Sequence, residues 1–231
     1  MSYIPEHLRA GFYVYDKAVL FQITVQSTYH AFHEITAGDI TAGTLLGWTQ
    51  YDGRVVSADI TSEADGTGHL LRIVCPSAHG LTTGDLVMIG NANNAGHNKP
   101  TRITTDGTNP TTEFLCDDIT YVAGAGGSSA TVVVPAYLKA NVGSAGDYNA
   151  SFSINGTAAA ANKVWKFELN TNITPNDNVV SERTTTGTLS EASPSGIITI
   201  ANGDKVWLSG KNSTDTSDFT IKNANIHLFK I

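Results

Sequence analysis

Residues 146–154 read Gly-Asp-Tyr-Asn-Ala-Ser-Phe-Ser-Ile, a stretch in which apolar and polar side chains alternate. Its apolar members are Tyr148, Ala150, Phe152 and Ile154. Side chains two positions apart lie on the same face of a strand, so this stretch predicts a strand with one buried face and one solvent-exposed face. Residues 164–169 alternate in the same way, with Trp165 and Phe167 in the buried phase.

The same period continues along the chain, and no stretch repeats apolar residues at helical spacing for three turns. Tight-turn pairs separate the predicted strands at short intervals, because glycine supplies the positive φ that such turns require. These pairs are Asp52-Gly53, Asp65-Gly66, Asp106-Gly107, Asn155-Gly156 and Asn202-Gly203. The sequence therefore predicts an all-β fold, a sandwich or a barrel.

Two short segments share a turn pattern that leads into a strand. Thr82-Thr83-Gly84-Asp85 precedes Leu86-Val87, and Ala201-Asn202-Gly203-Asp204 precedes Lys205-Val206. In each, glycine suits the special backbone angle and aspartate caps the turn. We interpret the similarity as shared turn chemistry and infer no duplicated domain from it.

The last strand is expected to contain an irregularity. Phe219 and Ile221 alternate in one phase, whereas Ile226 and Leu228 follow the other. A β-bulge near Asn223-Ala224 would account for the switch, since one extra residue exchanges the two faces. We also expect this strand to lie inside the sheet.

Charge and composition bear on the partners. The chain has a net charge of −7, which argues against a basic surface for DNA or RNA. No apolar stretch reaches the length of a membrane helix, and Pro5 and Glu6 interrupt the N-terminus where a signal peptide would be apolar. We therefore expect no nucleic acid or membrane partner, and synthesis in a reducing cytoplasm.

Acidic residues concentrate in the middle of the chain. Residues 56–134 carry a net charge of −5 and the remainder −2, and the segment ends in the glycine-rich run 123–129. We interpret 56–134 as a small module inserted into a larger domain formed by 19–55 and 135–231. Both cysteines, Cys75 and Cys116, fall within this insertion. On predicted strand faces they are expected to be core thiols and not metal ligands.

The sequence matches no catalytic template. It lacks a nucleophile elbow, a phosphate-binding loop ending in Lys-Ser or Lys-Thr, and a His-Glu-x-x-His helix. His30 and His33 are three apart, which places them on opposite faces of a strand, and so do the adjacent Asp117 and Asp118. We expect no enzymatic activity, no metal and no cofactor.

Aromatic residues crowd the N-terminus, where a monomer usually carries a polar end. They are Tyr3, Phe12, Tyr13 and Tyr15, and all precede the expected first strand at Val19. Aromatic side chains are enriched in interface cores, so residues 1–18 are a candidate docking arm. The alternative is that these side chains pack on their own domain.

Several segments resemble a known fold family. Residues 146–154, 164–170 and 197–208, together with 219–231, resemble the trimeric jelly roll of the tumour-necrosis-factor and complement-globular type, as found in bacteriophage structural proteins. Residues 19–25 and 28–48 look like the start of that domain. The resemblance implies a jelly-roll sandwich formed by 19–55 and 135–231.

The insertion carries a resemblance of its own. Residues 78–87, with Phe114 in the closing strand, look like the small β-barrel module related to the first catalytic-cysteine half-domain of ubiquitin-activating enzymes. This module recurs as an insertion in phage virion proteins. Because the enzyme's cysteine lies outside the module, the resemblance implies no ubiquitin chemistry.

Together the resemblances imply a phage virion structural protein that forms a homotrimer. The expected role is head decoration or capsid cementing, on the outer surface of the capsid, with the arm binding the major capsid protein. Candidates for the trimer interface are Tyr148, Trp165, Phe167, Trp207 and Phe219, each of which could instead fill its own core. The alternative function is a receptor-binding tail knob or fibre that recognises host glycans, for which Trp48 to Asp52 could supply an aromatic and polar groups.

Overall fold

The computed structural model describes residues 9–14, 19–21, 30–31, 48–51, 53–105, 109–123, 130–185, 188–215 and 219–231. The described strands are β1 Arg9–Val14, β2 Val19–Phe21, β3 His30–Ala31, β4 Trp48–Tyr51, β5 Arg54–Ser57, β6 Ser62–Asp65, β7 Leu70–Val74, β8 Leu86–Gly90, β9 Pro100–Thr105, β10 Glu113–Thr120, β11 Thr131–Val134, β12 Tyr137–Ala140, β13 Gly146–Ala158, β14 Lys163–Thr171, β15 Thr174–Thr185, β16 Thr188–Ala192, β17 Ser195–Ile200, β18 Lys205–Asn212 and β19 Phe219–Lys230. Two short 3₁₀ turns, η3 Thr67–His69 and η4 Ala95–His97, accompany them.

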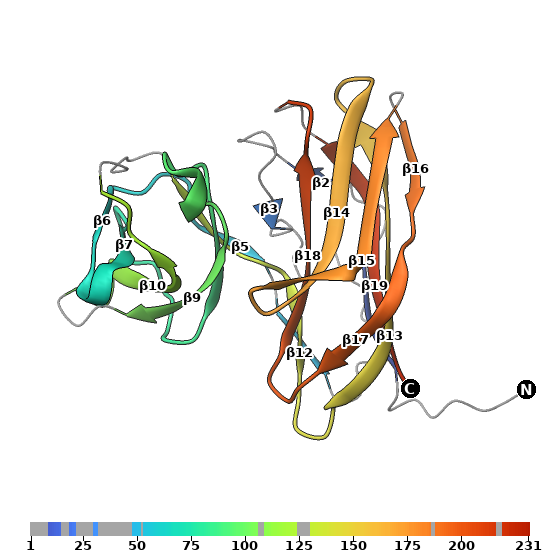
Figure 1. The fold of residues 1–231 in the computed structure, drawn as a ribbon, viewed down its shortest axis with the longest axis horizontal. Coiled ribbons are helices and arrows are strands. Elements are labelled where there is room, and N and C mark those ends of the chain that lie inside the picture. Colours follow the sequence, from blue (N-terminus) through green and yellow to red (C-terminus); the bar gives the residue numbers. More distant parts are fainter. Residues whose placement is uncertain are drawn as a thin grey trace, which may run out of the picture. The chain divides into compact units, whose positions relative to one another are not determined.

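Strands account for 63% of the structure and helices for 4%, which confirms the predicted all-β fold. The chain divides into two compact units (Figure 1). The sandwich unit comprises Met1–Gly53 and Ala136–Ile231, and the inserted unit comprises Arg54–Pro135. The division lies close to the predicted insertion of 56–134.

Two antiparallel sheets form the sandwich unit. The first has the order β1-β19-β13-β16, with β17 also paired to β13 and β2 to β19. The second has the order β15-β14-β18-β12-β4, with β3 paired to β18. Side chains from both sheets meet in one buried cluster that includes Phe152, Trp165, Leu208, Phe219 and Ile226. Burial alternates along most of β13, as its sequence predicts.

The predicted bulge in the last strand is present one residue away from its expected place. Along β13 and β19, Asn155 pairs with Asn223, whereas the next residue, Gly156, pairs with Ile221. Residue 222 is thus the extra residue, and it exchanges the inward phase between Ile221 and Ala224. Strand β19 lies between β1 and β13, inside its sheet as expected.

A curled, seven-stranded antiparallel sheet with the order β5-β11-β8-β9-β10-β7-β6 forms the inserted unit. It encloses its own hydrophobic core, which includes Leu71, Ile73, Val87, Ile103 and Phe114. Both cysteines belong to this core, as expected.

The two similar turns have the same hydrogen bond. Oδ2 of Asp85 accepts from the backbone N–H of Thr82 at 2.8 Å, and Oδ2 of Asp204 accepts from that of Ala201 at 2.7 Å. The intervening Gly84 and Gly203 have φ of 91° and 90°. Each turn thus launches a strand, β8 in the inserted unit and β18 in the sandwich unit, through the chemistry that the sequence predicts.

Candidate functional site

Part of the predicted docking arm is a strand. β1 pairs antiparallel with β19, and in its register Phe12 lies opposite Ile226 and Tyr13 opposite Asn225. The expectation that the first strand begins at Val19 is therefore wrong. Tyr3 and Tyr15 lie outside the described residues. A docking role for residues 1–18 stays a prediction. The backbone of residues 9–14 already pairs with β19 in the sheet.

The five aromatic candidates for the trimer interface are all buried within their own chain. Tyr148 is 2% exposed, and Trp165, Phe167, Trp207 and Phe219 are 0% exposed. A side chain without exposed surface cannot contact a partner subunit, so assigning these five to an interface is wrong. Tyr148, Trp165, Phe167 and Phe219 belong to the sandwich core, which was the alternative. Trp207 is buried outside that cluster, in a cross-strand row with Tyr137.

Their contacts explain this burial. Trp165 and Phe167 stack with a ring separation of 6.1 Å, and the Phe219 ring lies 5.1 Å from that of Trp165. The hydroxyl of Tyr148 donates to the Ser144 carbonyl at 2.6 Å, and the indole N–H of Trp207 donates to the Asn172 carbonyl at 2.7 Å. The polar atoms of Tyr148 and Trp207 are therefore satisfied, whereas the indole N–H of Trp165 is buried without a partner among the described residues.

The opposite phase of the same sheet forms a surface. On β13 the residues between the buried positions are Asp147, Asn149, Ser151, Ser153 and Asn155, none of which is buried. Cross-strand neighbours of this row are Ser195, Ile197 and Thr199 on β17, and Asn225, His227 and Phe229 on β19. We call these eleven residues the outer β13 face. Most are small and uncharged.

An apolar patch lies within the outer β13 face. Ile197 and Phe229 flank Asn149 on its two sides, and Ile197 is 59% exposed. The ionisable side chains of the face are Asp147 and His227, and burial lowers the pKa of His227, which favours its neutral form. The alternating polar residues of β13 are the sequence signal for this face. The large aromatic residues in the other phase are equally typical of an interface, so they were assigned to it instead.

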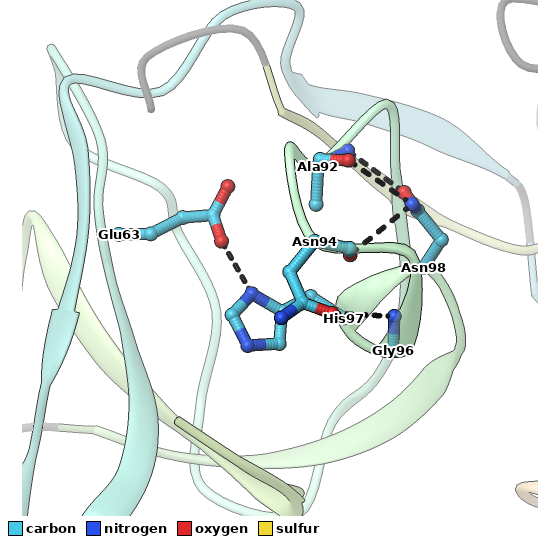
Figure 2. Close-up of polar contacts among 6 residues, drawn as sticks. All are labelled: Glu63, Ala92, Asn94, Gly96, His97 and Asn98. Atoms are coloured by element: carbon cyan, nitrogen blue, oxygen red, sulfur yellow. Dashed lines mark hydrogen bonds and ion pairs between the residues drawn. The ribbon is translucent and has the colours of Figure 1, made fainter. Parts of the chain in front are cut away.

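The inserted unit contains a buried ion pair that sequence reasoning missed. Nδ1 of His97, in η4, lies 2.5 Å from Oε2 of Glu63 in β6, and the two side chains are 1% and 0% exposed (Figure 2). Which of the two side chains donates in this hydrogen bond depends on the tautomer of the imidazole. The imidazole stacks on Tyr121 at 6.2 Å. The pair joins residues 34 apart in sequence, so no local pattern indicates it.

Two asparagines shape the loop that carries His97. The Asn94 side chain accepts from the backbone N–H of Gly96, and Asn98 bonds both the N–H and the carbonyl of Ala92 (Figure 2). These bonds fix the turn that directs the imidazole toward Glu63. Nε2 of His97 and Oε1 of Glu63 are buried without a hydrogen-bond partner among the described residues. Burying these two unpaired polar atoms lowers the stability of the folded inserted unit.

A second ion pair lies on the surface of the inserted unit. The Arg102 guanidinium donates to Asp118 at 3.2 Å, and the Arg102 backbone N–H donates to the same carboxylate at 3.0 Å. Burial alone would raise the pKa of Asp118, but these bonds outweigh it and lower the pKa below its ordinary value.

The two thiols are expected to be unreactive in the folded protein. Burial raises the pKa of Cys75 to about 11 and that of Cys116 well above its ordinary value. Because the thiolate is the nucleophile, iodoacetamide at pH 8 should alkylate neither cysteine in the native chain and both after denaturation. Mass spectrometry of labelled peptides measures this. Rapid labelling of native Cys75 would contradict the burial described here.

Within the described ranges, no three His, Cys, Asp or Glu side chains are grouped so that they could hold a metal ion. None of the helices in those ranges is long and apolar enough to cross a membrane. The candidate site is the outer β13 face, on which Ile197 is exposed. In comparisons with known proteins, no family model and no curated protein matches the chain.

Proposed function

We propose that the chain is a non-enzymatic virion structural protein of a bacteriophage, a homotrimer that decorates the outer surface of the capsid and stabilises it. The proposal combines the sequence resemblance with an all-β sandwich that carries an inserted β unit. The protein is made in the host cytoplasm and binds the major capsid protein of its phage.

The proposed trimer is supported mainly by the outer β13 face. Ile197 is 59% exposed, and Phe229 lies in the same cross-strand row with only Asn149 between them. The surrounding serines, asparagines and threonine are short and neutral, and Asp147 is the acidic residue among the eleven, so little repulsion between like charges opposes the approach of copies of this face, although the chain has a net charge of −7. Apolar patches rimmed by polar residues are typical of interaction sites.

A threefold axis suits this face. In a cyclic trimer each subunit presents the same residues toward the axis, so an apolar residue near it meets two copies of itself. Ile197 and Phe229 would supply that contact, and the serine and asparagine rows would supply hydrogen bonds around it. The proposed interface therefore uses the outward phase of β13, β17 and β19.

Replacing Ile197 by aspartate is expected to dissociate the trimer, because it places three carboxylates close to one axis. Sedimentation equilibrium should give three times 24.4 kDa for the wild type and 24.4 kDa for Ile197→Asp. Val122→Asp is the matched control, since Val122 is 48% exposed and belongs to the inserted unit. A monomeric wild type, or an Ile197→Asp variant that stays trimeric, would reject this interface.

Gold labelling of intact phage particles, viewed by electron microscopy, tests the location. Many labels over the head would support decoration. A few labels confined to the tail tip would instead support the receptor-binding knob, and no label on any particle would reject a virion role.

A further inference from the structure

The buried His97–Glu63 pair forms a closed polar unit inside the core of the inserted unit. Nδ1 of His97 and Oε2 of Glu63 are 2.5 Å apart, so a hydrogen lies between the two side chains. Nε2 of His97 and Oε1 of Glu63 are buried and have no hydrogen-bond partner in the part of the chain that the structure describes. Among the described residues, each side chain therefore has the other as its hydrogen-bonding partner.

Apolar side chains and an aromatic ring lie next to the pair. Glu63 is opposite Ile73 on β7, which is opposite Phe114 on β10, and both of these side chains are fully buried. The imidazole of His97 stacks on the ring of Tyr121. A net charge in such surroundings loses its hydration without gaining a counter-ion. We therefore expect the folded pair to have no net charge, with one ionisable proton held by the imidazole and the carboxylate together.

We propose that the His97–Glu63 pair takes up one proton when the inserted unit folds at neutral or alkaline pH, so that it makes this unit a proton-sensitive element of the chain. In an unfolded chain, histidine loses its proton at about pH 6.5 and glutamate at about pH 4.3. Above about pH 6.5 the unfolded pair therefore holds one proton fewer than the folded pair. The stability of the inserted unit then falls as the pH rises, until the folded pair itself loses its proton.

The opposite change occurs in acid. Below about pH 4.3 the unfolded pair holds two protons and the folded pair one, so stability falls as the pH falls. Between these two limits both states hold one proton, and the pair contributes no pH dependence. The inference goes beyond the proposed function and does not depend on the trimer or on a place in the virion, because both residues belong to the unit Arg54–Pro135.

Other ionisable side chains lie on the elements around the pair, and their titration cancels when variants of the pair are compared with the wild type. Cys116 belongs to the same core, and burial raises the pKa of its thiol well above the ordinary value, so this thiol stays neutral at neutral pH. The ionisable side chains on β6, β7 and β10, and just after η4 and β10, are Asp65, Arg72, Lys99, Glu113, Cys116, Asp117, Asp118 and Tyr121.

Urea denaturation of the full chain between pH 5 and 9 tests the proposal, with the fraction unfolded read from a brief dithiodipyridine pulse. Cys75 and Cys116 lie in the inserted core, so their labelling reports the unfolding of this unit. At a fixed urea concentration above about pH 6.5, the ratio of the wild-type unfolding constant to that of Glu63→Gln should rise about tenfold for each pH unit. The amide of Glu63→Gln can donate to Nδ1 of a neutral imidazole, so this variant takes up no proton on folding.

His69→Ala is the control, because His69 contacts Asp65 at the surface of the same unit, and its unfolding constant should follow the wild type across this range. If Glu63→Gln does not fold, Glu63→Leu combined with His97→Phe replaces it, since this double variant also lacks the shared proton. The proposal is overturned if the wild type and the folded variant of the pair have parallel pH dependences. It is also overturned if His69→Ala removes the alkaline loss of stability as fully as Glu63→Gln does.

Discussion

Replacing His97 by alanine is expected to lower the free energy of unfolding of the inserted unit by about 3–5 kcal/mol. The reason is the carboxylate that remains. Glu63 is 0% exposed at its side chain, and the described contact to its Oε2 is the His97 imidazole. Without that partner, a buried carboxylate must stay unpaired or take up a proton, and either outcome favours the unfolded state.

The chain provides a matched control for this pair. His69 and Asp65 form a His–carboxylate contact of 3.1 Å in the same unit, but their side chains are 83% and 46% exposed. Exposed pairs contribute about 0–1 kcal/mol, so His69→Ala should have a small effect. Urea denaturation measures both variants. Equal losses for His97→Ala and His69→Ala would contradict the importance of burial.

A double replacement tests whether the His97–Glu63 pair adds to the free energy of unfolding or serves mainly to fix the arrangement of η4 and β6. Glu63→Leu combined with His97→Phe exchanges two buried polar groups for apolar side chains, and each of these groups has an atom without a hydrogen-bond partner in the described part of the chain. Such exchanges are often neutral or stabilising, so the double variant should be far more stable than His97→Ala. We interpret the wild-type pair as a device that fixes how the loop around η4 joins β6.

Local patterns predict the elements of this fold because its strands obey a period of two. The alternation in β13, the turn chemistry at Asp85 and Asp204, and the bulge beside Asn223 all follow from neighbours in sequence. Each depends on a backbone preference or on which side chains must leave water. These features therefore follow from the sequence alone.

Properties that depend on distant neighbours were missed. The His97–Glu63 pair joins η4 to strand β6, which lie far apart in sequence and which only the curled sheet brings together. β1 is recognisable as a strand only once β19 offers a free edge to residues 9–14. The interface candidates failed for a related reason. Large aromatic residues favour both cores and interfaces, and periodicity alone does not tell which face of β13 is covered by the second sheet.

The distinction between core and interface leads to the last prediction. Replacing Trp165 by alanine is expected to destabilise the sandwich unit by about 3–5 kcal/mol, because the indole is fully buried against Phe167 and Phe219. Trp165→Phe is the conservative control. It keeps an aromatic ring and removes the indole N–H, which is buried without a partner among the described residues, so its cost should be about 1 kcal/mol or less.

Measuring denaturation and mass on the same variants separates the two roles. Trp165→Ala should shift the denaturation midpoint, and the molecules that remain folded should keep the mass of the wild type. Ile197→Asp should do the reverse, because Ile197 is 59% exposed and lies outside the core. A Trp165→Ala variant that changes mass while its unfolding stability is unaltered would place this side chain at a subunit contact and overturn its assignment to the core. If Trp165→Ala lowers only the stability and Ile197→Asp changes only the mass, the inward-facing residues stabilise the fold and the outward-facing residues hold the subunits together.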